Sequence, residues 1–245
     1  MRHLITALLL LFLTSCSSPS AGPGIVARVD PLLPADAVLL GEQHDAPGHQ
    51  QAHRDMVRSL AQRGLLAAVV LEMAEQGAST AGLPRDADEA AVQAALQWND
   101  KAWPWTAYGP AVMAAVQAGV PVLGGNLPRA GMRAAMADAR LDQQLPGPAL
   151  KAQQQAIRLG HCGALPESQI GPMTRVQVAR DQAMARTVAG AARPGQTVLL
   201  IAGAGHVAPD LGVPQHLPSG FKSVPVVLPP VATGKDYCKD FRRAS

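Results

Sequence analysis

Apolar residues along this chain occur in two kinds of pattern. Short runs such as residues 37–41 (AVLLG) and 197–202 (TVLLIA) are apolar at nearly every position, which is typical of strands buried on both faces of a parallel sheet. Between such runs the apolar residues recur three or four positions apart, as Met56, Val57 and Leu60 do, and this spacing predicts amphipathic helices. The alternation predicts an α/β fold with three layers: a mostly parallel sheet covered by helices.

The same alternation places the individual elements. Pro225 lacks a backbone N–H donor, so the last strand is expected at an edge of the sheet. The segment 74–118 is too long for a simple crossover, and we expect part of it to be a helical insertion. Strands are expected at residues 37–41, 67–71, 120–123, 197–202 and 224–228, and helices at residues 47–63, 87–96, 106–119, 130–139, 149–159 and 174–191.

The N-terminal sequence MRHLITALLLLFLTSC has the pattern of an export signal. Arg2 supplies a positive charge, and the apolar run over residues 4–13 is shorter than the roughly 20 residues that span a membrane. Its end, LTSC, resembles the lipobox of bacterial lipoproteins, in which the signal is removed and Cys16 becomes the lipidated N-terminus. An ordinary secretory signal with an incidental cysteine is the alternative. Ser17, where an aspartate would indicate inner-membrane retention, favours the outer membrane.

We therefore expect a lipoprotein signal peptide at residues 1–15, a flexible tether at 16–30 and a single α/β domain at 31–245. This organisation places the protein in the bacterial cell envelope, held to the membrane by a lipid anchor. Hydrophobic residues make up 48% of the sequence and charged residues 16%, which are values of a globular protein. The formal net charge of +3 comes from dispersed basic residues without a Lys/Arg run, so no nucleic-acid partner is expected.

Two cysteines remain if Cys16 is lipidated. In an oxidising periplasm, Cys162 and Cys238 are expected to form one disulfide that fixes the C-terminal tail to the loop after Gly160. The alternative is that Cys162, which follows His161 directly, acts as a ligand or a nucleophile.

Polar residues follow four of the predicted strands at the point where each strand ends. Glu42 and His44 follow the first, Glu72 the second, Asn126 the third and His206 the fourth. In open α/β sheets, ligands bind outside the carboxyl ends of the strands, and the neighbouring glycines let the backbone turn tightly or approach a ligand. We expect a shared site at this rim; a polar, solvated edge is the alternative.

Two further histidines and a group of aromatic residues are also candidates for ligand contacts. His49 and His53 are four residues apart, so on a helix they share one face, which suits either a metal site or a solvated helix surface. The chain is poor in aromatic residues, yet it holds one cluster inside the predicted insertion. This cluster forms either a small core or the wall of a pocket for a flat apolar ligand: Trp98, Trp103, Trp105 and Tyr108.

The motifs LLGEQHDAPGHQ, VVLEM, WPWTAYGP, VPVLGGNLPR, GHCG and AGAGHV resemble those of the ChaN family, haem-binding lipoproteins of the Tiki and erythromycin-esterase-like superfamily. The resemblance covers most of residues 36–217. Its most specific part is the pair of Gly-x-x-His motifs, GEQH at 41–44 and GAGH at 203–206. It implies a three-layer α/β core with a helical insertion, haem binding and a role in iron uptake, with an outer-membrane haem or iron receptor as a partner. A homodimer is left open.

The resemblance also assigns residues to a hydrolytic function. Glu42, His44, Glu72 and His206 match the polar centre of the superfamily, whose Tiki-like relatives are associated with metal-dependent peptide cleavage and whose esterase-like relatives resemble general-base hydrolases. As a hydrolase, the protein would use Glu42, His44 and His206 to bind a divalent metal or to activate water. Glu72 would then act as acid and base, or support a ligand.

As a haem carrier, the protein would cover the porphyrin with aromatic side chains, hold the iron through an axial tyrosine or histidine, and meet the propionates with arginines. Tyr108 is the first choice for the axial ligand, because phenolate ligation of haem iron is known chemistry; His49 and His44 follow. The aromatic cluster favours haem binding and the acid–imidazole rim favours hydrolysis. The remaining expected contacts of haem are Trp103, Trp105, Asn126, Arg129 and Arg175.

Overall fold

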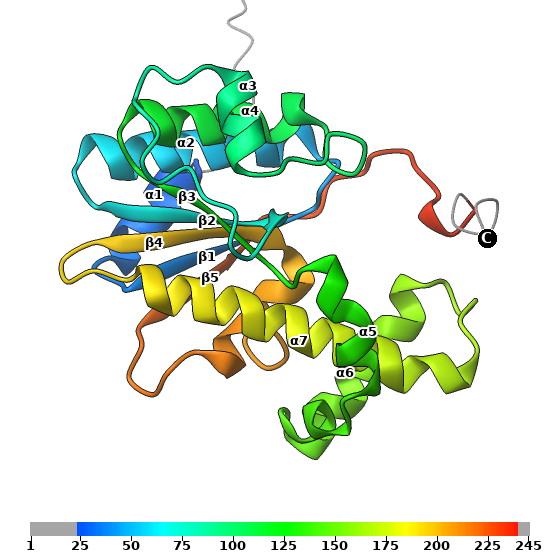
Figure 1. The fold of residues 1–245 in the computed structure, drawn as a ribbon. Helices are drawn as coiled ribbons and strands as arrows, with labels where there is room; N and C mark the ends of the chain where they lie inside the picture. The colour runs from blue at the N-terminus through cyan, green and yellow to red at the C-terminus, as the bar shows by residue number, and fades with distance from the viewer. Residues whose placement is uncertain (1–23, 240–245) are drawn as a thin grey trace, which may run out of the picture.

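The computed structural model describes residues 24–239 and shows a sheet between two helical layers (Figure 1). All strand pairs within the sheet are parallel, and the strand order is β3-β2-β4-β1-β5. The predicted α/β fold is confirmed, and the strand that contains Pro225 lies at an edge, as predicted. The strands are β1 (Ala37–Glu42), β2 (Leu66–Glu75), β3 (Val122–Asn126), β4 (Thr197–Gly203) and β5 (Ser223–Val227).

Alternate residues of each strand face opposite helical layers, which explains why the strands are apolar throughout. Val38 and Leu40 of β1 belong to the core under one layer, whereas Leu39 belongs to the core under the other. The first layer consists of α1 (Ile25–Val29), α2 (Pro47–Gln62), α3 (Glu89–Ala95) and α4 (Trp105–Gln117).

The opposite face is covered by the long helix α7 (Glu167–Ala191), whose N-terminal half extends beyond the sheet (Figure 1). There it packs against α5 (Arg129–Ala137), the short helix η2 (Ala139–Gln143) and α6 (Gly147–Gly160). These elements form a helical lobe with a small core of its own, which includes Leu141, Leu145 and Val176. Three further short helices are η1 (Asp30–Leu32), η3 (Ala204–Val207) and η4 (Val213–His216).

Two expectations about organisation need correction. Residues 25–29 of the predicted tether form α1, because Ile25 and Val29 are buried against the sheet core. The predicted insertion at 74–118 contains α4, but α4 is the crossover helix between β2 and β3 and packs beside α2 in the first layer. Within residues 74–118, only the segment between β2 and α4 is additional to the crossover, and its helix α3 packs against α4 in the first layer.

The predicted signal peptide and Cys16 lie outside the described residues. Within residues 24–239, no helix is both long enough and apolar enough to cross a membrane. The structure joins Cys162 to Cys238 by a disulfide, at a sequence separation of 76. Cys162 lies in the turn after α6, so this bond attaches the C-terminal segment to the helical lobe.

Candidate functional site

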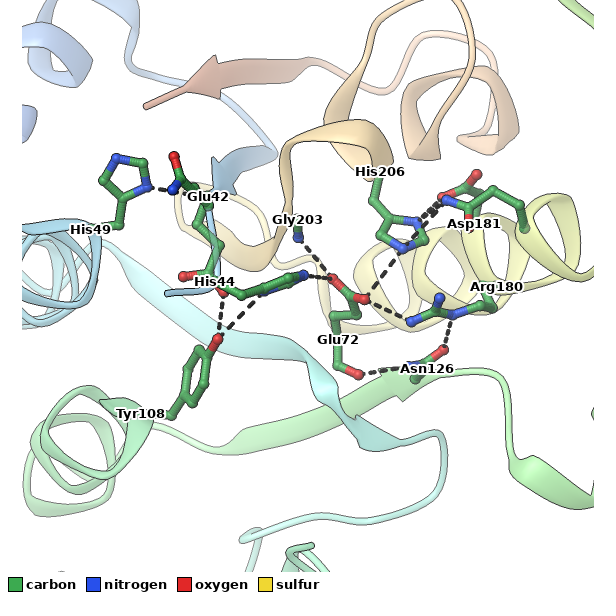
Figure 2. Close-up of polar contacts among 12 residues, drawn as sticks. Glu42, His44, His49, Glu72, Tyr108, Asn126, Arg180, Asp181, Gly203 and His206 are labelled. Carbon is green, nitrogen blue, oxygen red and sulfur yellow. Dashed lines mark hydrogen bonds and ion pairs between the residues drawn. The ribbon is translucent and has the colours of Figure 1, made fainter. Parts of the chain in front are cut away.

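The polar residues expected at the rim gather into one contact network at the carboxyl ends of the strands (Figure 2). Glu42 ends β1, Glu72 lies near the end of β2, Asn126 ends β3, and His206 lies in η3 just after β4. The register pairs Glu42 with Gly203 across β1 and β4. The parallel arrangement therefore brings together side chains that are far apart in the sequence.

Glu72 is the centre of this network and is almost completely buried. Its Oε2 accepts a hydrogen bond from the backbone N–H of Gly203 over 2.7 Å, and its Oε1 accepts one from Arg180 over 2.6 Å. Nε2 of His206 lies 3.3 Å from Oε1. Burial alone would raise the pKa of Glu72, but His206 and Arg180 outweigh it and lower the pKa well below its ordinary value. Glu72 is therefore a carboxylate at neutral pH.

His206 lies between two carboxylates. Its Nδ1 is 2.5 Å from Oδ1 of Asp181, on the side opposite to Glu72. Burial lowers the pKa of His206, but the charges of Glu72 and Asp181 dominate and raise it to about 10. His206 is therefore held as an imidazolium at neutral pH, with a carboxylate facing each of its ring nitrogens.

Glu42 is the centre of a second group of contacts. Tyr108 donates its hydroxyl to Glu42 Oε1 over 2.7 Å, and Nδ1 of His44 lies 2.7 Å from the same oxygen. Nε2 of His53, which is fully buried, lies 3.2 Å from Oε2. Burial lowers the pKa of His53 to about 4, and burial together with Glu42 raises the pKa of Tyr108 far above its ordinary value. Both side chains are therefore uncharged at neutral pH.

His44 connects the two groups and reaches the surface. Its side chain is 38% exposed, its Nε2 lies 3.8 Å from Oε2 of Glu72, and its ring lies 4.8 Å from that of Trp103. Burial lowers the pKa of His44, but the hydrogen bond to Glu42 and the charges of Glu72 and Glu42 give a net rise. A Cβ at Gly203 would lie 2.9 Å from His44 Nε2, so the glycine of the second motif makes room for the histidine of the first.

A cavity of about 360 Å³ opens beside this network. Trp103, Leu127 and Met132 supply apolar surface, and Arg129 and Arg180 supply positive charge. The predicted contacts Trp103, Asn126 and Arg129 therefore do line a cavity, which we call the rim cavity. Its lining consists of Glu72, Met73, Ala74, Glu75, Gln97, Asn99, Ala102, Trp103, Asn126, Leu127, Arg129, Met132 and Arg180.

Two expected axial ligands do not face the rim cavity. Tyr108 is only 2% exposed, and its hydroxyl is bonded to Glu42. His49 is buried, accepts at Nδ1 from the backbone N–H of Gln43 and donates from Nε2 to the carbonyl of Pro229. Neither Tyr108 nor His49 has a free, accessible donor atom in this structure, so the geometry does not favour either as the iron ligand, and the assignment stays a prediction.

Two of the expected haem contacts are also corrected. Trp105 is buried and donates its indole N–H to Glu89, so it belongs to the small aromatic core under α3. Arg175 makes a two-point contact with Asp142 inside the helical lobe and does not line the rim cavity. Both residues are structural here.

The residues expected to bind a divalent metal do not converge. Among residues 24–239, no group of three or more His, Cys, Asp or Glu side chains is placed to hold a metal ion. Glu42 contacts His44, but His206 points to Asp181 and Glu72 instead. The predicted metal trio of Glu42, His44 and His206 is therefore not supported by the donor geometry.

Helix α7 supplies site residues that the sequence reading missed. Arg180 bonds both Glu72 and Asn126, and Asp181 pairs with His206. Gln177 contacts the same imidazole. These positions are three and four residues apart, so they share one face of the helix. The signal that could have found these residues is their helical spacing, as polar positions among buried apolar neighbours.

The chain matches the model of a known family over residues 29–217, and the description of this family is haem-binding uptake, Tiki superfamily, ChaN. Its fold is similar to a solved structure of ChaN from Campylobacter jejuni that shows cofacial haem binding. The two are 25% identical, the match covers 83% of this chain and 85% of the other, and the TM-score is 0.69. No curated protein matches the chain. With the family model matched across most of its length, the chain belongs to the ChaN family of the Tiki superfamily.

Proposed function

We propose that the protein binds haem in the rim cavity. The observation that carries this proposal is the lining: the apolar side chains of Trp103, Leu127 and Met132 share one cavity with Arg129. The guanidinium of Arg129 has no carboxylate partner among the described contacts. A porphyrin needs apolar contact with its faces and cationic contact with its propionates. Membership of a haem-binding uptake family supports the same ligand.

The rim-cavity residues would divide these tasks. Trp103 and Met132 would pack against the macrocycle, and Arg129 would pair with a propionate, because Arg180 already contacts Glu72 and Asn126. Haem iron would supply a Lewis-acid centre that accepts an imidazole nitrogen. His44 does not itself line the cavity, but it fits that role best among the expected ligands, because it is exposed and its ring lies 4.8 Å from that of the lining residue Trp103. Glu42 holds its Nδ1, an arrangement that fixes the ring and increases the basicity of the other nitrogen.

Titration of the apo-protein with haemin, followed by the Soret band, tests the proposal. Arg129→Ala should weaken binding, and His44→Ala should also change the spectrum. The matched control is Arg133→Ala, which removes an exposed arginine from the same helix outside the cavity. A wild-type protein that takes up no haemin would overturn the proposal, and equal effects of the two arginine variants would remove Arg129 from the site.

We further propose that the protein is a lipoprotein of the outer membrane that takes part in haem or iron uptake and passes haem to a surface receptor. The LTSC sequence before Cys16 supports the anchor. Cys16→Ser should release the protein from the membrane fraction and abolish incorporation of labelled fatty acid. Retention of label in this variant would contradict the lipid anchor. Haem-dependent dimerisation, measured by light scattering, tests the homodimer.

A second candidate function rests on one contact. The 2.7 Å pair of Glu42 and His44 has the arrangement of an oriented general base, and His44 is accessible from solvent. In this form the protein would be a hydrolase that activates water through His44 without the metal trio. His44→Ala should then abolish hydrolysis of an activated ester, whereas Arg129→Ala should leave it intact. Absence of turnover by the wild type would remove this candidate.

A further inference from the structure

The C-terminal segment, residues 229–239, runs along the loop that follows β1, and we call this segment the strap. The carbonyl of Pro229 accepts from His49, and Val231 exchanges two backbone hydrogen bonds with the side-chain amide of Gln43, over 3.0 and 3.1 Å. Tyr237 donates its hydroxyl to Asp45, 3.0 Å from each carboxylate oxygen. Gln43 and Asp45 flank His44, so the strap holds the loop that carries this imidazole.

The strap is attached by polar contacts and one covalent bond rather than by burial. All its side chains except those of Thr233 and Cys238 are exposed, and the apolar side chains of Val231 and Tyr237 are about half exposed. Nζ of Lys235 lies 2.9 Å from Asp45. Exposed ion pairs of this kind contribute little to stability. The disulfide of Cys238 is therefore the strongest single attachment of the strap.

The other half of this disulfide belongs to the helical lobe. Cys162 lies in the turn between α6 and α7, and the lobe has a core separate from the two sheet cores. The lobe begins at α5, which contributes Arg129 and Met132 to the rim cavity. Trp103, whose ring lies 4.8 Å from that of His44, contributes to the same cavity from the segment before α4. The disulfide thus links the lobe, through the strap, to the loop that carries His44.

We propose that the strap and its disulfide form a clamp that holds the helical lobe in position beside the His44 loop, so that a bound ligand leaves the rim cavity when the clamp opens. The identity of the ligand rests on the proposed haem site, whereas the clamp rests only on the contacts of the strap and its disulfide. Reduction by a dithiol opens the clamp in a defined way. The S–S bond breaks, Cys162 and Cys238 each gain an electron and a proton as thiols, and the dithiol is oxidised to a disulfide.

Hydrogen exchange of the apo-protein, read by mass spectrometry, tests the clamp without haem. The double variant Cys162→Ser/Cys238→Ser should exchange faster than wild type in residues 43–50 and 147–166, with residues 197–203 of the central strand unchanged. Wild-type protein treated with a dithiol should behave as the double variant does. The matched control is the double variant treated with the dithiol, which should show no further change, since the reagent then has no disulfide to act on.

Transfer of haem to an excess of haem-free globin gives the second readout. Opening of the clamp should speed haem release on the order of tenfold, the effect of a typical coupling between two sites. Equal exchange and equal release in wild type and double variant would overturn the clamp. If the double variant does not fold, reduction of the folded wild type gives the same comparison. If the wild type takes up no haem, the proposed function fails, while the exchange experiment still decides on the clamp.

Discussion

At the scale of single residues, the site is a set of buried charges that compensate one another. Glu72 and Asp181 supply the negative charges, and Arg180 and His206 supply the positive charges. Moving an ion out of water costs several kcal/mol, so each of these charges is tolerated because its partners are within hydrogen-bonding distance. Removing one member leaves its neighbours with fewer compensating charges.

Glu72→Gln should therefore destabilise the fold by about 3–5 kcal/mol, because it leaves Arg180 and His206 with too little negative charge. Urea unfolding measures the loss. The control is Glu75→Gln, an exposed position on the same strand, where we expect a change within about 0.5 kcal/mol. Similar midpoints for the two variants would show that the charge network contributes little to stability.

The imidazolium of His206 predicts a dependence of stability on pH. Its pKa is raised from 6.5 to about 10 in the folded state. The contribution of the charged form is therefore complete below about pH 6.5 and is lost as the pH rises through about 10. The melting temperature of wild type should fall between pH 7 and pH 10.5 by more than that of His206→Gln. Parallel curves for the two proteins would contradict the protonated state of His206.

Tyr108 was the first choice as an iron ligand from the sequence, and its burial now predicts the opposite result. Tyr108→Phe keeps the ring packing and removes a hydrogen bond to a carboxylate, which should cost about 1.5–3 kcal/mol in the free energy of unfolding. The Soret spectrum of the haem complex should stay unchanged. Loss of a charge-transfer band in this variant would show that Tyr108 reaches the iron after all.

At the scale of elements, the strands were predictable and the helix contacts were not. Apolar runs at nearly every position defined β1 and β4, and the strand ends located Glu42, Glu72, Asn126 and His206 without a structure. Arg180 and Asp181 could not be selected in advance, because periodicity assigns residues to a helix face but does not say which turn of a 25-residue helix crosses the sheet. For the same reason, Arg175 was selected as a haem contact, although Arg180, five residues later on the same helix, is the arginine that lines the rim cavity.

The second Gly-x-x-His motif permits a matched pair of substitutions. Gly203→Ala would place a Cβ 2.9 Å from His44 Nε2, whereas a Cβ at Gly205 meets nothing within 4 Å. Gly203→Ala should displace His44 and weaken haemin binding, and Gly205→Ala should bind as wild type does. The imidazole resonances of His44 in an NMR spectrum report the displacement directly. Equal spectra for both variants would mean that the two glycines are interchangeable.

At the scale of the whole molecule, the helices form two separate groups: the layers that cover the sheet, and the helical lobe with its own core. Sequence spacing predicted the layers, and the two cysteines that remain beside Cys16 predicted the pairing of Cys162 with Cys238. It did not predict that residues 129–176 form a lobe with its own core, because a local pattern of apolar positions shows that a helix is amphipathic but not which partner covers it. Nor did it show that the C-terminal residues lie against the loop of His44.

The pairing of β1 with β4 has a consequence for how the molecule is made. Ala37 lies beside Val198 in the sheet, so the two histidine motifs become neighbours only after most of the chain has been synthesised and the large intervening loop has closed. Contacts between such distant residues form slowly in folding. A chain synthesised from its N-terminus therefore contains Glu42 and His44 before the strand that completes their surroundings has been made. The binding centre should mature last, and nascent chains shorter than β4 should lack it altogether.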